Sequence, residues 1–193
     1  PHYPPINVAW EIAADEGFAQ VRQSGIVTAD ETLAHSVHVQ VEGLEPDRWY
    51  FYRFRAGDAL SPVGRTRTAP AAGADNGRFS FAFAACQQYE QGWYSAYRDM
   101  AGRDLDLVVH LGDYIYEKSY GAEHVRSHGT GAPSLLFEYR DRYALYKSDP
   151  DLMAAHAAFP WLVTWDDHEV VDNYGQDASP TDRHPEAFLR RRA

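Results

Sequence analysis

The stretch from Leu105 to Glu117, which reads LDLVVHLGDYIYE, constrains the fold of this chain more than any other. Its apolar run ends at the turn signal Gly112-Asp113, and this pattern predicts a buried strand of a parallel sheet. In open α/β sheets, ligands gather at the carboxyl ends of such strands, and Asp113 lies at that end. A carboxylate there is a candidate ligand for a hard metal ion, although Asp at a strand end is also common as a plain turn or cap residue.

Two further strands are predicted in the same part of the chain, and each also ends at polar residues. The first ends at Cys86, and the last ends at the run Asp166-Asp167-His168-Glu169, with Asn173 shortly after. The order strand, helix, strand favours parallel βαβ units and therefore an α/β fold. The predicted strands cover residues 79–85, 105–111 and 161–165, and the predicted helices cover residues 92–100, 135–146 and 149–158, the last with Asp149 as its cap.

Three successive strands therefore end in side chains that can bind metal ions, which predicts a site at one edge of the sheet. Carboxylate and amide oxygens suit Ca²⁺, Mg²⁺ or Mn²⁺, whereas phenolate and thiolate suit iron. Such a mixed set favours a multi-metal centre that generates hydroxide and bridges a phosphoryl group, with His168 as a proton donor or phosphoryl contact. The candidate ligands are Cys86, Asp113, Tyr116, Asp166, Asp167 and Asn173.

Each of these residues also has a structural interpretation when it is taken alone. A lone cysteine is more often a small buried hydrophobe, and a lone tyrosine is more often a core residue.

Arg140 and Arg142, on a predicted helix, could meet a substrate phosphate, but the default interpretation is that both are solvated or salt-bridged helix residues. Among the other histidines, the pattern predicts a packed core residue at His110, surface loop residues at His124 and His128, and a structural residue at His156.

The composition excludes some classes of function. The net charge of −10 argues against general nucleic-acid binding, which needs a basic surface. It does not exclude a phosphate-bearing substrate, because bound cations invert the local field. Cys86 is the one cysteine, so no disulfide forms within the chain and the redox compartment cannot be inferred. No apolar run is long enough to span a bilayer, and no signal-peptide pattern opens the chain.

Residues 1–70 are predicted to form a separate all-β module, with short antiparallel strands near residues 8–12, 37–41, 49–55 and 65–68. Its motif LEPDRWY, which contains Tyr50, resembles the tyrosine corner of fibronectin type III sandwiches. Such a sandwich needs about seven strands and no more than five are predicted, so we expect an incomplete sandwich. Residues 71–77 are predicted to be a linker, and residues 78–193 form the α/β part.

The α/β part resembles the PhoD-like alkaline phosphatases and phosphodiesterases of the calcineurin-like metallophosphatase superfamily. The segments that carry the resemblance are residues 83–87 (FAACQ), 110–117 (HLGDYIYE) and 139–173. Gly112-Asp113 corresponds to the GD-x-x-D motif of the superfamily, with Tyr116 in the last place as in purple acid phosphatases. Asp167-His168-Glu169 stands where the superfamily has GNH-E/D.

The resemblance implies a role for each candidate. Asp113 would be a bridging ligand, and Cys86 and Tyr116 would bind Fe³⁺. Asp167 and Asn173 would bind a second centre with Ca²⁺, Asp166 would bind metal or orient its neighbours, His168 would be catalytic, and Arg140 would bind substrate. The family resemblance also implies hydrolysis of a phosphate monoester or diester and a secreted, periplasmic or cell-surface location.

The sequence departs from the superfamily pattern in two ways. The first D-x-H motif is absent and Cys86 stands near its place, as is typical of PhoD-like proteins. The later His-containing segments are also absent, and only a polar loop and a basic end, residues 188–193 (FLRRRA), follow Asn173. We therefore expect the first part of an αββα domain, in a fragment without its C-terminal half. The alternatives are a catalytically inactive Ca²⁺-binding or partner-binding module, or a second chain that supplies the missing half.

Overall fold

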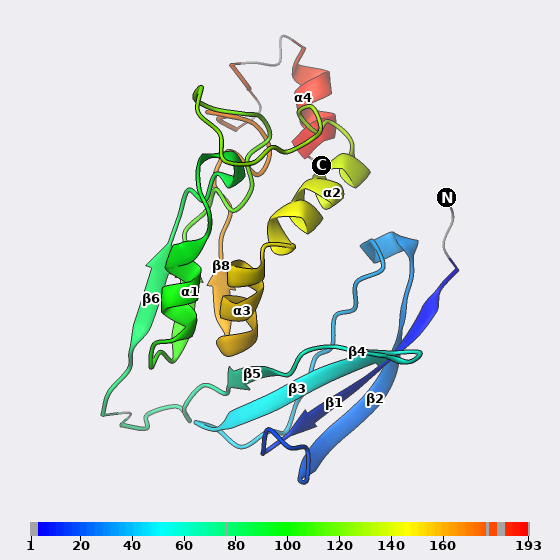
Figure 1. Ribbon diagram of the computed structural model, residues 1–193, viewed down its shortest axis with the longest axis vertical. Coiled ribbons are helices and arrows are strands. Elements are labelled where there is room, and N and C mark those ends of the chain that lie inside the picture. The colour runs from blue at the N-terminus through cyan, green and yellow to red at the C-terminus, as the bar shows by residue number, and fades with distance from the viewer. Residues whose placement is uncertain (1–3, 76, 177, 181–183, 193) are drawn as a thin grey trace. The chain divides into compact units, whose positions relative to one another are not determined.

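The computed structural model describes residues 4–75, 77–176, 178–180 and 184–192 of the chain. The chain divides into two compact units, and most of their helices and strands are labelled in Figure 1. The first unit contains Pro1–Ser80 with His156–Pro160, and the second contains Phe81–Ala155 with Trp161–Ala193. No helix among the described residues has the length and apolar composition needed to cross a membrane.

The first unit is built on one antiparallel sheet with the strand order β2-β1-β3-β4, in which β5 also pairs with β3. The hydroxyl of Tyr50 accepts a hydrogen bond from the backbone N–H of Glu45 at 3.0 Å, which is the contact predicted for the tyrosine corner. The elements are β1 (Ile6–Ala13), β2 (Val21–Ala29), the 3₁₀ helix η1 (Glu31–Leu33), β3 (Trp49–Ala56), β4 (Ala59–Leu60) and β5 (Gly64–Arg67).

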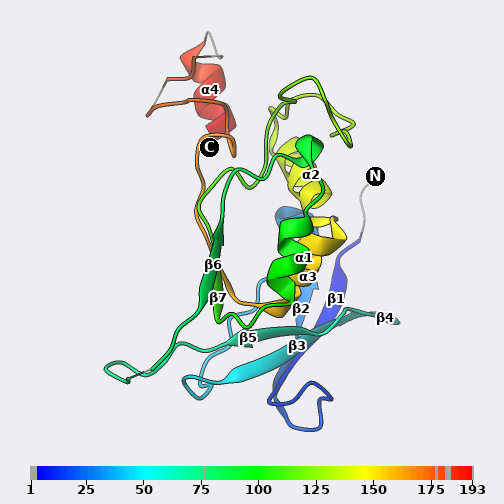
Figure 2. The same cartoon turned by 60° about the vertical axis from the view of Figure 1, so that its left-hand side comes forward.

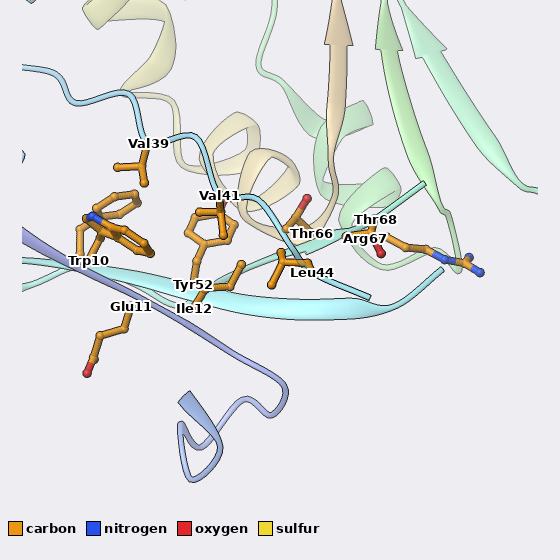
Figure 3. Close-up of a pocket in the computed structure, with 11 residues that line it drawn as sticks. Trp10, Glu11, Ile12, Val39, Val41, Leu44, Tyr52, Thr66, Arg67 and Thr68 are labelled. Atoms are coloured by element: carbon orange, nitrogen blue, oxygen red, sulfur yellow. The ribbon is translucent and has the colours of Figure 1, made fainter. Parts of the chain in front are cut away.

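The strand predicted over residues 37–41 is not present. Burial alternates along this segment as expected, but among the described residues it pairs with no other strand. Val39 and Val41 instead lie over the sheet beside Trp10 and Tyr52, where they line a pocket of about 380 Å³ (Figure 3). The alternation therefore reports which side chains face the sheet, and it does not report whether the backbone has a partner.

Strand β2 is not predicted by the sequence pattern, because its apolar residues do not follow its burial. Ile26 is 72% exposed, whereas the neighbouring Gly25 is half-buried and lies on the opposite face of the strand. A Cβ atom at Gly25 would lie 2.8 Å from Nε1 of Trp10, so the glycine leaves room for the indole ring on the neighbouring strand. A residue without a side chain carries no hydrophobic signal even where it faces the core.

The second unit confirms the predicted α/β order. Its sheet has the order β6-β7-β8, and both pairings are parallel. The Asp149 carboxylate caps α3 by accepting the backbone N–H groups of Asp151 and Leu152. The elements are β6 (Phe81–Ala84), the 3₁₀ helix η2 (Tyr89–Gln91), α1 (Ser95–Ala101), β7 (Leu107–His110), α2 (Leu136–Lys147), α3 (Pro150–Ala158), β8 (Trp161–Val163) and α4 (Pro185–Arg192).

The two faces of this parallel sheet differ. Figure 2 shows α1 and α3 together on one side of the sheet. Val108 and His110 are fully buried, and the ring of His110 stacks on Trp161, whose indole N–H donates to the carbonyl of Ala155 on α3. On the other face, the register places Phe83 beside Val109 and Val109 beside Leu162. Phe83 is 65% exposed and Leu162 is 60% exposed. Within the described residues of this unit, one apolar face is therefore covered and the other is not.

Three predictions for the second unit are wrong. His128 is buried rather than on the surface, because its ring packs on Tyr146. Arg142 is neither solvated nor salt-bridged, since it is buried and donates to backbone carbonyls, including that of Tyr116. The segment after Asn173 contains α4 in addition to loop. His110 is a packed core residue, as predicted.

Candidate metal centre

The turn at Gly112 brings the ends of two strands together. Its φ of 110° is unfavourable for any residue with a side chain, which is the reason for glycine at the end of β7. A Cβ atom there would lie 2.6 Å from Cβ of Asp166 and 2.8 Å from its backbone nitrogen. Any other residue at position 112 would therefore push the segment after β8 away from the end of β7.

The backbone of the candidate ligands is also unusual. Cys86, Asp113 and Asn173 have φ values of 56°, 56° and 55°, in the left-handed region that residues other than glycine seldom occupy. The N–H of Cys86 donates to the carbonyl of Gly112, and the N–H of Gln87 donates to the carbonyl of Asp113. These bonds join the loops after β6 and β7. Strained backbone of this kind gathers at functional sites, where the surrounding structure holds it in place.

The side chain of Asp113 is the centre of the cluster. Its Oδ2 accepts hydrogen bonds from Sγ of Cys86 at 3.4 Å and from the hydroxyl of Tyr116 at 3.1 Å. Its Oδ1 is buried and has no hydrogen-bond partner among the described residues. A buried carboxylate oxygen without a partner is costly, unless a cation meets it.

Two residues that follow β8 complete the cluster. One ligand atom from each of Asp113, Asp167 and His168 lies within 4.8 Å of the other two. Oxygen and imidazole donors at this spacing fit a divalent or trivalent metal ion. The free Oδ1 of Asp113 supports the same conclusion, so the residues present fit a bound metal ion.

His168 is held by a carboxylate that the sequence analysis did not single out. Its Nδ1 lies 2.8 Å from Oε2 of Glu117, and its ring stacks on Tyr116 with 4.2 Å between ring centroids. Burial by itself would lower the pKa of His168, but its hydrogen bond to Glu117 and the nearby carboxylate charges raise it overall.

A second carboxylate, which the sequence analysis named without giving it a role, holds the loops rather than the cluster. Glu169 accepts the backbone N–H groups of Asp113, Tyr114 and Asp166. One side chain thus fixes the loop after β7 to the loop after β8. Burial raises the pKa of Glu169, although these hydrogen bonds oppose the effect. Glu117 follows directly after the predicted ligand Tyr116, and Glu169 follows directly after the predicted catalytic residue His168. That adjacency is the signal that could have found both glutamates.

The remaining predicted site residues lie near the cluster or apart from it. Asn173 is exposed, and its backbone N–H donates to the Asp167 carboxylate. Asp166 is exposed, and the structure does not place it in the group of three that can share a metal. Arg140 lies half-buried on α2, and its role in substrate binding stays a prediction.

Burial also acts on the two candidate iron ligands. It raises the pKa of the Tyr116 hydroxyl and, although Cys86 as a whole is exposed, partial burial also raises the pKa of its thiol. The neighbouring Asp113 carboxylate adds to both shifts. Without a cation, the thiol and the hydroxyl therefore keep their protons and donate them in hydrogen bonds to Asp113. A bound metal ion would invert this effect by favouring thiolate and phenolate.

Comparison with known proteins identifies the family. A family model described as PhoD-like phosphatase matches residues 81–193, and a model of the N-terminal domain of PhoD-like phosphatases matches residues 2–70. The chain belongs to the PhoD-like phosphatase family. It is 52% identical to alkaline phosphatase D of Bacillus subtilis (strain 168) over 97% of its own length.

A solved structure agrees with this assignment. The structure described as that of PhoD matches 99% of the chain with a TM-score of 0.95 and 50% sequence identity. The chain spans 33% of the length of the Bacillus subtilis relative and 38% of the solved PhoD chain. The match therefore establishes the family and the fold of this segment, which is about a third of its relative.

Proposed function

We propose that the second unit carries the metal-binding part of a phosphate-ester hydrolase, an alkaline phosphatase or phosphodiesterase. The observation that carries this proposal is the convergence of Asp113, Asp167 and His168 within 4.8 Å, with Oδ1 of Asp113 buried and without a partner. Membership of the PhoD-like phosphatase family and the similarity to a relative named alkaline phosphatase D support the same activity.

The residues of the chain divide into metal-holding and substrate-facing groups. Cys86, Asp113, Tyr116 and Asp167 would hold the metals, with Fe³⁺ near the thiol and phenol and Ca²⁺ near the carboxylates. When bound, these ions would supply a hydroxide nucleophile and positive charge for the phosphoryl oxygens.

His168 belongs to the cluster of three, and within the proposal we assign its side chain to the substrate. Because Nδ1 faces Glu117, Nε2 is the ring nitrogen left for a phosphoryl oxygen or a leaving group. A protonated Nε2 can donate its proton to the leaving oxygen, and Glu117 stabilises the imidazolium before that transfer. The substrate would be a phosphate monoester or diester.

The experiment that tests this proposal combines metal content with turnover. Asp113→Asn keeps the size of the side chain but removes its charge, and Asp99→Asn is the control because Asp99 is an exposed carboxylate of α1. We expect calorimetry to show Mn²⁺ binding to the parent chain and to Asp99→Asn, and none to Asp113→Asn. Equal binding by all three chains would reject the proposed site.

Hydrolysis of chromogenic phosphate esters is measured on the same samples. Turnover that depends on Asp113 would establish the hydrolase within this chain. Metal binding without turnover would instead fit the alternative of an inactive Ca²⁺-binding module, or a catalytic site that another polypeptide segment completes. The assay is run with a monoester and with a diester, because the geometry of the cluster favours neither substrate.

We further propose that the second unit is part of an αββα domain. The exposed apolar face around Phe83 and Leu162 supports a second sheet there, because parallel sheets are normally covered on both faces. This sheet would come from a further segment of the polypeptide or from a second chain.

The tyrosine corner supports a fibronectin type III-like sandwich for residues 1–70, joined by a linker at 71–77 to the catalytic part at 78–193. We also propose a secreted, periplasmic or cell-surface location, which rests on the family resemblance alone.

A further inference from the structure

Three buried polar side chains lie next to each other in the second unit, and the proposed chemistry uses none of them. Glu90, His128 and Tyr146 are each at least nine-tenths buried, and we call them the Glu90 network. They come from η2, from the loop between β7 and α2, and from α2. Burying an acid, an imidazole and a phenol together is costly unless their polar atoms meet partners, so their contacts indicate what the network does.

The direction of the hydrogen bonds follows from the number of donors at Tyr146. Its hydroxyl oxygen accepts the backbone N–H of Tyr116 at 3.0 Å and that of Tyr89 at 3.2 Å. A hydroxyl has two acceptor sites, so both are filled and its own proton must go elsewhere. The remaining neighbour is Nε2 of His128 at 2.9 Å, which must therefore accept that proton as an unprotonated nitrogen.

The same reasoning fixes the tautomer of His128. With Nε2 as an acceptor, a neutral ring carries its proton on Nδ1, which lies 3.4 Å from Oε2 of Glu90 in a contact that does not meet hydrogen-bond geometry. The other oxygen of Glu90 accepts the backbone N–H of His128 at 2.9 Å. Burial, followed by the charge of Arg142, lowers the pKa of His128 to about 4, which agrees with the neutral ring that the hydrogen bonds require.

The network ends at a residue of the metal site. Tyr116, whose N–H is held by Tyr146, directs its hydroxyl to Asp113 at 3.1 Å. The carbonyl of Tyr116 accepts a hydrogen bond from the buried Arg142. Both backbone polar groups of Tyr116 are thus bound to side chains of α2, which leaves its backbone little freedom to rotate.

We propose that the Glu90 network positions Tyr116 at the metal site by holding its backbone N–H in a fixed direction. This inference rests on the proposed function, since it assigns Tyr116 a place among the metal ligands. No member of the Glu90 network belongs to the group of three residues that can share a metal, so we assign its members a positioning role. A network that served only the stability of the core would not need to end on a residue that touches Asp113.

The test removes one hydroxyl. Tyr146→Phe deletes the acceptor of the Tyr116 N–H and preserves the ring, whereas Tyr50→Phe is the matched control. The Tyr50 hydroxyl also accepts a backbone N–H at 3.0 Å and is buried, but it lies in the first unit. Tyr50→Phe leaves one backbone N–H without its acceptor, whereas Tyr146→Phe leaves two, those of Tyr116 and Tyr89. Both variants are therefore expected to unfold at a lower urea concentration than the parent, with the larger loss in Tyr146→Phe.

Two measurements on the whole chain separate positioning from stability. The first is the hydrogen-exchange rate of the Tyr116 amide relative to that of Val108, a buried strand residue that reports global opening. The second is the Mn²⁺ affinity from calorimetry. Tyr146→Phe is expected to raise the exchange ratio about tenfold and to weaken Mn²⁺ binding about 10- to 100-fold, as the loss of outer-shell partners does elsewhere. Tyr50→Phe is expected to change neither.

The outcomes decide between the inference and its alternatives. An unchanged exchange ratio in Tyr146→Phe overturns the inference, and so does a raised ratio with unchanged Mn²⁺ affinity. If the parent chain binds no Mn²⁺, the proposed function fails, but the exchange ratio still tests the hold on Tyr116. Should Tyr146→Phe not fold, His128→Gln and His128→Leu replace it, because Gln can accept the Tyr146 proton and Leu cannot. Only the Leu variant is then expected to raise the ratio.

Discussion

The carboxylate of Glu117 lies 2.8 Å from Nδ1 of His168, and its side chain is 2% exposed. The same carboxylate accepts the hydroxyl of Tyr120 and the backbone N–H of Asp172. A buried acid with these partners orients the imidazole without meeting solvent. This is the arrangement by which an outer-shell carboxylate fixes the tautomer of a metal-site histidine.

Replacement of Glu117 by Gln should weaken metal binding. Gln keeps the size and one acceptor but removes the charge that stabilises His168, so we expect Mn²⁺ affinity to fall about 10- to 100-fold. Glu123→Gln is the control, since Glu123 is exposed in the loop before α2. Calorimetry on both variants gives the comparison. Equal affinities would mean that the orientation of His168 does not influence the metal site.

The close approach at Gly112 predicts a large cost for any side chain there. Gly112→Ala adds a Cβ atom 2.6 Å from Cβ of Asp166 to a backbone with positive φ. Gly129→Ala is the control, since its φ is 71° and an added Cβ would meet nothing within 4 Å. Backbone strain alone costs about 1–2 kcal/mol, so Gly129→Ala should lose that amount and Gly112→Ala clearly more. Urea unfolding measures both, and equal losses would contradict the close approach.

Acid should destabilise the chain partly through His110. This side chain is fully buried, and burial lowers its pKa to about 4 from an ordinary value of 6.5. Because the folded state resists protonation, the contribution of His110 is complete above pH 6.5 and is lost as the pH falls toward 4. A shift of this size corresponds to about 3 kcal/mol at most.

The share that belongs to His110 is isolated with His110→Leu. The free energy of unfolding is measured from pH 7.5 to pH 4 for the parent and for the variant. We expect a weaker dependence on pH in His110→Leu, although not a flat one, because burial also lowers the pKa of His128 to about 4. Parallel curves for the two proteins would show that His110 does not carry this effect.

How much of the structure could be predicted depends on where its signals lie. The succession of strands and helices, the parallel pairing and the Asp149 cap follow from local patterns, so the sequence predicts all three. The gathering of Cys86, Asp113 and His168 was predicted from strand ends, since parallel strands bring their carboxyl ends to one edge. These are features in which neighbouring residues determine the result.

The features that the sequence did not predict depend on distant partners. His128 has no local signal of burial, because its partners Glu90 and Tyr146 lie 38 and 18 residues away. Glu117 has no signal of its role until His168 is placed 51 residues along the chain. Over residues 37–41, the apolar alternation predicted which side chains are more buried, but it did not predict that the backbone lacks a strand partner among the described residues. A polar residue beside a predicted ligand therefore merits attention as an outer-shell partner.

The exposed face of the parallel sheet predicts self-association of this chain. Phe83 is 65% exposed and lies beside Val109 in the register, with Leu162 on the next strand. Large apolar patches of this kind bind another surface or aggregate. Phe83→Lys places a charge in the middle of the face, and because the side chain is exposed, the stability should change by no more than about 0.5 kcal/mol.

Sedimentation velocity of the parent and of Phe83→Lys tests whether this face is a docking surface. We expect the parent to associate at micromolar concentrations and the variant to remain monomeric. Leu33→Lys is the control, because Leu33 is an exposed apolar residue of the first unit, 46% exposed on η1. If Leu33→Lys removes association as well, general hydrophobicity is responsible. If only Phe83→Lys removes association, the exposed face of the sheet is the surface through which the chain self-associates. This is the face on which the second sheet of an αββα domain would pack.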